Sequence, residues 1–233
     1  MINTYAFRIR KLFRIELLRY LGVIFFVLMP LPIGVFSVGE LISLNDRVDY
    51  KLNNTYYMSG VEVYSNVNLI YMIGSLINSD RDVFINGYRK ENNDKTLDIS
   101  VHIAKYVAFT NDKFNFKELG PERFNISNEE NESGPSGGLM MSLCFVEMIR
   151  EVDYYGLRIA GTGEINAYGM VLPIGGVKYK TLAVNKSNID IFFVPIANYM
   201  EARKYINNKV DLVKVGNLND ALQYLTKYDK INR

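Results

Sequence analysis

The longest apolar stretch of the chain lies near its N-terminus. Residues 20–39 contain no charged residue, and about 20 apolar residues are what a helix needs to cross a bilayer. Residues 1–19 carry five basic side chains, and such a flank stays on the cytoplasmic side of a membrane. The pattern predicts a single-pass transmembrane anchor over 20–39, with a cytoplasmic N-terminus and the remaining chain outside the cytoplasm.

Two other interpretations of this stretch are open. Pro30 and Pro32 interrupt it and would kink a helix, although membrane helices tolerate proline better than soluble ones. A cleaved signal peptide is the first alternative, but the stretch is longer than a usual signal core and no small-x-small cleavage site follows it. A buried core helix is the second. A retained anchor is favoured over both.

After residue 39 the pattern is that of a folded domain. Residues 54–64 are rich in tyrosine and valine with partial alternation, which predicts a strand, and 66–78 have apolar residues at helical spacing. A second helix is expected over 97–109, starting near Asp98. The polar segment 110–133 is expected to be a loop or linker.

The C-terminal half alternates between the two periodicities. A glycine-rich turn at residue 134 leads into a helix, and strands and helices then follow in turn. The expected elements are a helix over 139–149, a strand over 157–165, a strand over 190–195, a helix over 199–206, a strand over 210–215 and a helix over 218–228. This order predicts an α/β (α+β) fold.

Composition limits the chemistry. An apolar fraction of 48% favours a folded protein, and 27 basic against 25 acidic residues give no global charge that would attract a nucleic acid. The single cysteine, Cys144, excludes a disulfide within the chain, and the single histidine, His102, makes a multi-histidine metal site or a histidine-dependent triad hard to build. Both residues are taken as structural. No cofactor, metal or nucleic-acid partner is expected.

Ser136 lies between glycines just before the apolar helix. Its hydroxyl would be exposed there, and backbone N–H groups at the helix start could form an oxyanion hole in the loop Gly134-Pro135-Ser136-Gly137-Gly138. An ordinary helix-capping serine is the alternative interpretation. A glycine-rich phosphate cradle is a third.

A second glycine pair, at 175–176, precedes two lysines. If 177–186 is helical, Lys180 shares a face with Val177, Ala183 and Val184, whereas Lys178 points elsewhere. Burial disfavours the charged form of an amine, and a neutral amine is what the activation of a serine requires. A lysine that snorkels to the surface is the alternative. Thr162, in the tight turn Gly161-Thr162-Gly163, could orient the amine.

The three motifs GPSGG, GTGEI and VLPIGGVKYK, in this order, resemble the proteolytic domain of Lon peptidases, which use a serine and a lysine without histidine. The resemblance covers roughly 54–228 and is strongest over 134–195. It is closest to the membrane-anchored Lon-like peptidases of bacteria. It implies that Ser136 is the nucleophile, that Lys180 is the general base and that Thr162 lies beside the lysine. The loop from Gly134 to Gly138 would shape the oxyanion hole.

The sequence departs from this family in two ways. Gly137 stands where alanine is more usual, and 110–133 leaves room only for a loop where the anchored relatives insert a PDZ domain. No phosphate-binding G-x-x-x-x-G-K-[ST] motif of an ATPase module occurs. Residues 40–233 are therefore expected to form one Lon-type proteolytic domain behind the anchor.

The expected function is that of an ATP-independent, membrane-anchored serine endopeptidase that cleaves peptide or protein substrates outside the cytoplasm. The resemblance also implies assembly into a homo-oligomeric ring. The alternative is a catalytically inactive Lon-fold binding or regulatory module at the membrane. The presence of the serine, the threonine and the lysine together counts against this alternative. A nucleotide-binding function is a third, weaker hypothesis.

Overall fold

The computed structural model of the chain describes residues 2–85, 94–112, 134–150 and 156–232. It divides into two compact units. The first unit comprises Met1–Ser37 with Val63–Arg89, and the second unit comprises Val38–Glu62 with Lys90–Arg233. Strands β1 (Ile33–Ser43) and β2 (Thr55–Tyr64) each contribute residues to both units.

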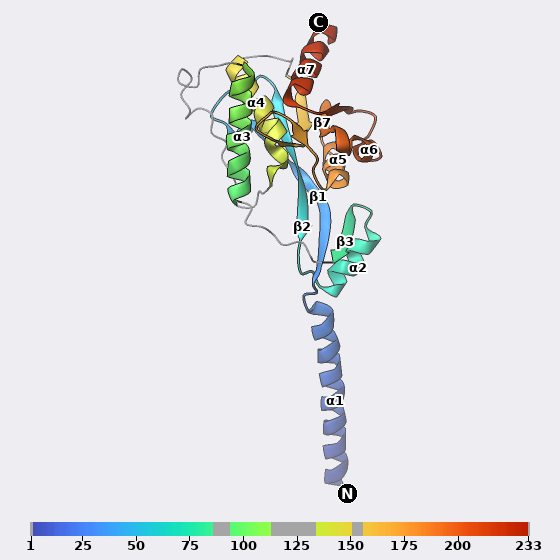
Figure 1. Cartoon of the computed structure of the whole chain (residues 1–233). Helices are drawn as coiled ribbons and strands as arrows, with labels where there is room; N and C mark the ends of the chain where they lie inside the picture. The colour runs from blue at the N-terminus through green and yellow to red at the C-terminus, as the bar shows by residue number, and fades with distance from the viewer. Residues whose placement is uncertain (1, 86–93, 113–133, 151–155, 233) are drawn as a thin grey trace. The chain divides into compact units, whose positions relative to one another are not determined.

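The first unit contains two helices and a short antiparallel pairing (Figure 1). Helix α1 spans Ile2–Leu28, α2 spans Leu69–Ile77 and β3 spans Arg81–Ile85. Strand β3 pairs antiparallel with the first residues of β1, from Ile33↔Ile85 to Ser37↔Arg81. The side chain of Asn68 caps α2 by accepting a hydrogen bond of 2.9 Å from the Tyr71 N–H.

The apolar stretch 20–39 does not form one helix. Helix α1 ends at Leu28, and β1 begins at Ile33. Pro30 and Pro32 lie between them and have no N–H to continue the helical hydrogen bonding, so the chain leaves the helix there. The prediction of one helix over 20–39 is therefore wrong. Among the described residues, no helix is both long enough and apolar enough to cross a membrane.

The second unit is built on a mostly parallel sheet. Strand β2 pairs parallel with β4 (Arg158–Gly161), β4 with β7 (Ile191–Pro195), and β7 with β8 (Asp211–Val215). The strand order runs β1, β2, β4, β7, β8. Strand β7 is buried on both faces, as a central parallel strand should be.

Successive side chains of the central strands face opposite layers of helices. Ile191 and Phe193 pack in one core cluster with α3 (Asp94–Asp112), α4 (Gly138–Arg150) and α7 (Leu218–Asn232). Figure 1 shows α3 and α4 next to each other. Phe192 and Val194 pack in the other cluster with α5 (Val177–Asn185) and α6 (Tyr199–Ala202). The fold is therefore a mixed α/β layered structure, as the sequence predicts.

Helix α4 is the most deeply buried helix segment of the second unit, since its residues from Gly138 to Ile149 are all buried. Its one acidic residue, Glu147, is 2% exposed. The carboxylate accepts hydrogen bonds from the Asn53 N–H (2.6 Å), the Asn54 side-chain amide (2.6 Å) and the Tyr56 hydroxyl (2.7 Å). These bonds satisfy the buried charge and fix the start of β2 against α4.

Most expected elements are confirmed with shifted ends, and two are altered. The expected strand over 157–165 is split into β4 and β5 (Glu164–Ile165), because the chain turns at Thr162 and Gly163. The expected helix over 199–206 is limited to α6. Strands β1, β3 and β6 (Val171–Leu172) are not anticipated by the sequence pattern. Of the expected loop 110–133, residues 113–133 lie outside the described part of the chain.

Candidate active site

Ser136 lies in a single 3-10 turn, Pro135–Gly137, that opens directly into α4. Gly134 before it has φ 104°, a backbone conformation that only glycine adopts readily. The Ser136 carbonyl accepts hydrogen bonds from the Gly163 N–H (2.7 Å) and the Thr162 hydroxyl (3.3 Å). The serine turn is thus tied to the turn between β4 and β5.

Lys180 projects from α5, whose first residue follows Gly176, a glycine with φ 69°. Val177, Ala183 and Val184, on the same face, are buried, and Lys180 itself is only 5% exposed. Lys178 is half-buried, and its amine lies 5.2 Å from the Tyr179 ring centroid. The expectation that Lys180 is the more buried of the two lysines agrees with these positions.

The three polar side chains singled out in the sequence meet at one point of the second unit. The Lys180 Nζ lies 2.7 Å from the Ser136 Oγ and 3.1 Å from the Thr162 Oγ1. Thr162 is fully buried, and its N–H donates to the Phe193 carbonyl at 3.0 Å. A hydroxyl nucleophile, an amine and an orienting hydroxyl are therefore in hydrogen-bond contact.

The environment of the lysine favours its neutral form. Burial lowers the pKa of Lys180 from 10.5 to about 8. Its two hydrogen-bond partners, Ser136 and Thr162, are uncharged hydroxyls, so they offer the ammonium no compensating negative charge. With a pKa near 8, about one tenth of the amine is neutral at pH 7. This arrangement can accept a proton from a serine without histidine.

Glycine at 137 has a steric reason. A Cβ at that position would lie 2.3 Å from the Met58 Sδ. Alanine, which is more usual in the resembling family, would therefore require Met58 to move. The neighbouring Gly138 is less crowded, because the nearest atoms to a Cβ there, which include the backbone nitrogen of Ile165, would lie 3.0 Å away. The departure at Gly137 is thus matched to a methionine in β2.

The helix-start amides are partly used within the protein. The Gly138 N–H donates to the Pro135 carbonyl, and the Leu139 N–H donates to the Gly163 carbonyl at 3.0 Å. Pro135 has no N–H to offer. Neither of these two bonds uses the N–H of Ser136.

Asn198 is a buried residue near this site that the sequence reasoning does not include. Its side-chain oxygen accepts from the Ile174 N–H (2.9 Å), and its side-chain nitrogen donates to the Ile174 carbonyl (3.0 Å). This pair of bonds fixes the loop just before α5. No local motif marks Asn198, because its partner lies 24 positions earlier.

Cys144 and His102 lie apart from this chemistry. Cys144 is fully buried, and burial, together with the charge of Glu147, raises the pKa of its thiol. His102 is exposed on α3. Within the described ranges, no group of three or more His, Cys, Asp or Glu side chains could hold a metal ion.

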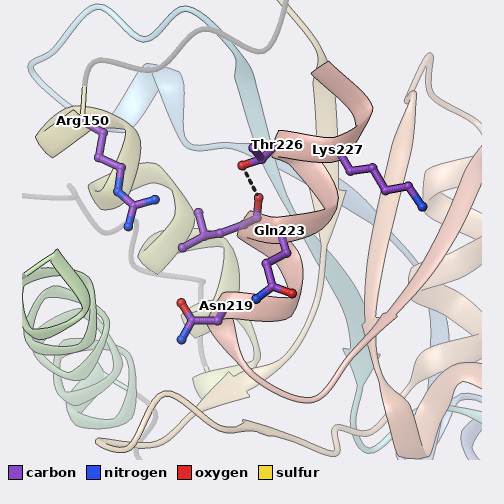
Figure 2. A pocket seen from close by; sticks show the side chains of 6 residues that line it. Arg150, Asn219, Gln223, Thr226 and Lys227 are labelled. Atoms are coloured by element: carbon purple, nitrogen blue, oxygen red, sulfur yellow. Dashed lines mark hydrogen bonds between the residues drawn. The ribbon is translucent and has the colours of Figure 1, made fainter. Parts of the chain in front are cut away.

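An open hollow of about 380 Å³ lies between the end of α4 and α7. Figure 2 shows its polar lining, with the Thr226 hydroxyl bonded to the Leu222 carbonyl one turn earlier. The lining residues are Arg150, Asn219, Leu222, Gln223, Thr226 and Lys227. None of them belongs to the group around Ser136, so the hollow is separate from the candidate site.

Fold and site together describe a mixed α/β domain in which a serine at a helix start contacts a buried lysine, which is an arrangement of the serine–lysine type. Residues 129–227 match the family model of the Lon protease (S16) C-terminal proteolytic domain. The matched range contains Ser136, Thr162 and Lys180. The resemblance to Lon peptidases read from the three motifs is thereby confirmed for this part of the chain.

Individual relatives agree with this family. The Lon protease of Aster yellows witches'-broom phytoplasma is 33% identical over 93 residues, which is 39% of this chain and 12% of that protein. The Lon protease of Campylobacter jejuni is 33% identical over 97 residues, or 40% and 12% of the two chains. Lon protease homolog 2, peroxisomal, of Caenorhabditis briggsae is 28% identical over 146 residues, or 59% and 18%. The chain thus corresponds to only 12–18% of the length of these three relatives.

Proposed function

We propose that this protein is a serine peptidase in which Ser136 is the nucleophile and Lys180 the general base. The observation that carries the proposal is the 2.7 Å distance between the Ser136 Oγ and a lysine amine that is 5% exposed. The same distance accommodates a serine O–H that donates to a neutral amine. A surface lysine would be protonated at pH 7 and could not act in this way.

In the proposed reaction, the neutral Lys180 Nζ accepts the Ser136 hydroxyl proton while the Oγ attacks the carbonyl carbon of the scissile peptide. The backbone N–H groups of Ser136 and Gly137 stabilise the negative oxygen of the tetrahedral intermediate. The ammonium then gives its proton to the leaving amine, and an acyl-enzyme remains. Lys180 next takes a proton from a water molecule as the water oxygen attacks the ester carbonyl. The resulting ammonium then gives this proton to the Ser136 Oγ as the acid product leaves, which restores the free serine and the neutral amine.

Thr162 is proposed to position the lysine. Its hydroxyl lies 3.1 Å from the Lys180 Nζ and 3.3 Å from the Ser136 carbonyl oxygen. It therefore bridges the helix that carries the base and the turn that carries the nucleophile. Because it is uncharged, it orients the amine without stabilising the ammonium form.

The substrates are proposed to be peptides or loosely folded proteins, cleaved without ATP. These 233 residues contain no P-loop motif, so we propose no ATP-binding step for them. Hydrolysis of an unfolded protein such as casein, measured with and without ATP, tests it.

Assembly into a ring remains a proposal from the resemblance, and the molar mass in detergent solution tests it.

We also propose that α1 attaches the chain to a membrane. Large apolar side chains on its described part are exposed, and five basic residues lie in the first 19 positions. A helix with these features binds at a lipid surface through apolar burial and attraction to anionic lipids. The exposed residues include Phe13, Leu17, Leu18, Leu21, Ile24, Phe25 and Phe26.

The test of the peptidase is covalent labelling of the full chain by a serine-directed acylating probe, followed by peptide mapping. We expect label on Ser136, and no label in the Ser136→Ala or Lys180→Ala variants. Tyr168→Phe, a change at a residue that is 91% exposed, is the matched control and should label normally. A folded wild-type protein that is neither labelled nor active on casein would favour the inactive binding module instead.

A further inference from the structure

Helix α2 exposes an apolar face and buries a polar side chain. Ile70, Ile73 and Ile77, one turn apart on one face, are 58%, 48% and 82% exposed. On the opposite side, Ser75 is fully buried, and its hydroxyl donates to the Tyr71 carbonyl at 2.8 Å. In water such a helix turns its apolar face inward. The exposed face of α2 therefore fits an apolar surrounding.

We propose that this face, the isoleucine stripe of Ile70, Ile73 and Ile77, lies on the lipid surface into which α1 inserts. The inference extends the proposed membrane attachment and rests on it. It adds a second contact, made by a helix that is too short to span a bilayer. Nine residues of α-helix extend only about 13 Å.

The backbone places the start of α2 close to the end of α1 within the first unit. The Leu31 N–H donates to the Val67 carbonyl at 3.0 Å, and the Val67 N–H donates to the Ile33 carbonyl at 3.1 Å. Leu31 follows the last residue of α1 by three positions, a reach of roughly 10 Å. The residues that enter α2 are thus held close enough to the end of α1 for both to lie in the same bilayer interface.

The charge pattern agrees with a lipid contact. Residues 63–79, which include all of α2, contain no charged side chain. Tyrosine and arginine side chains cluster at α2. Arg81 lies 5.1 Å from the Tyr71 ring centroid, and the Tyr64 and Tyr71 rings are 5.4 Å apart. Tyrosine and arginine anchor proteins at the level of the lipid headgroups.

The chain contains no tryptophan, so a single introduced tryptophan reports its surroundings without background. Three full-length variants carry the test, and each replaces an exposed aromatic or apolar residue: Phe25→Trp on α1, Ile73→Trp on the stripe, and Tyr168→Trp in the second unit as the matched control. Each protein is reconstituted into vesicles of phosphatidylcholine and phosphatidylglycerol, with and without dibrominated acyl chains, which quench tryptophan only at lipid contact.

We expect blue-shifted emission and quenching by the brominated lipid for Phe25→Trp and Ile73→Trp, and neither for Tyr168→Trp. Quenching of Phe25→Trp alone would overturn the stripe contact and leave the attachment by α1 standing. Quenching of neither would overturn both. A blue shift of Ile73→Trp without quenching would mean that protein, such as a second copy of the chain, covers the stripe, and the inference would be wrong.

Discussion

Replacing Lys180 with methionine should stabilise the protein at pH 7 while it removes the proposed catalytic base. The lysine is 5% exposed, and burial lowers its pKa from 10.5 to about 8. That shift corresponds to about 3 kcal/mol of unfavourable free energy in the folded state at pH 7. Methionine fills a similar volume without charge.

The gain is reduced by the hydrogen bonds that the amine makes to Ser136 and Thr162. Two bonds to neutral hydroxyls contribute about 1 kcal/mol each. Thr162 keeps its bond to the Ser136 carbonyl, so its hydroxyl is not left unpaired. We therefore expect Lys180→Met to raise the free energy of unfolding at pH 7 by about 1 kcal/mol.

The pH dependence gives the sharper test. Between pH 8 and 10.5 the unfolded lysine holds a proton that the folded lysine has lost, so the stability of the wild type rises with pH through this range. From pH 7 to 9.5 the wild type should gain about 2 kcal/mol relative to Lys180→Met. Below pH 8 the penalty is present in full and does not change.

The assay is urea denaturation of both proteins in detergent solution at pH 7, 8.5 and 9.5. The difference between the two free energies at each pH cancels the titration of all other groups. A difference that stays constant from pH 7 to 9.5 would refute the lowered pKa of Lys180. It would also remove the basis for a neutral amine at the site.

Three further predictions follow from the same contacts. The acylation rate, measured with a pre-activated ester substrate, should rise about tenfold for each pH unit up to pH 8 and then level off, because only the neutral Lys180 accepts a proton. A rate that does not change between pH 6 and 8 would contradict this. Thr162→Val, which keeps the shape but loses both hydroxyl contacts, should lower kcat by roughly tenfold to a hundredfold with a smaller change in KM, whereas Thr162→Ser should restore most of kcat. Asn198→Ala and Asn185→Ala each remove two side-chain bonds to backbone groups beside α5, so both should destabilise the protein by roughly 1–3 kcal/mol. Only Asn198→Ala should lower kcat, since Asn198 holds the loop that leads into the lysine helix. Equal kcat losses would mean that the losses follow from destabilisation and that neither residue positions Lys180.

The sequence is sufficient to predict the pair Ser136 and Lys180, which the structure brings into hydrogen-bond contact, and the reason is local. Each lies in a short motif, and the helical periodicity of α5 separates Lys180 from Lys178 through the burial of Val177 and Val184. No such local information exists for β1. Its apolar residues continue the apolar run of α1, and its partner in β3 lies about 50 positions later, at Ile85 for Ile33.

The break between β4 and β5 is another feature that only packing determines. The sequence from Leu157 to Ile165 looks like one strand, but Gly163 lets the chain turn against Val171 and Leu139. A Cβ at Gly163 would lie 2.6 Å from the Val171 side chain. Both contacts come from residues outside the segment 157–165, so the turn that places Thr162 beside the lysine cannot be read from its own pattern.

The topology explains why Ser136 and Lys180 come from opposite sides of the sheet. Ser136 precedes α4, which packs on the face of Ile159 and Phe193, and Lys180 belongs to α5, which packs on the face of Ala160 and Phe192. Side chains from opposite faces can meet only where the strand between them has ended.

Strand β4 ends at Gly161, and the next residue, Thr162, bonds to both the Ser136 carbonyl and the Lys180 amine. A Cβ at Gly161 would lie 2.4 Å from the Met140 Sδ, so α4 approaches the strand end as closely as a glycine permits. The distance from Ser136 to Lys180 is therefore determined by where β4 stops and by how closely α4 packs on it. A longer strand or a larger residue at 161 would separate the two groups even though neither would have changed.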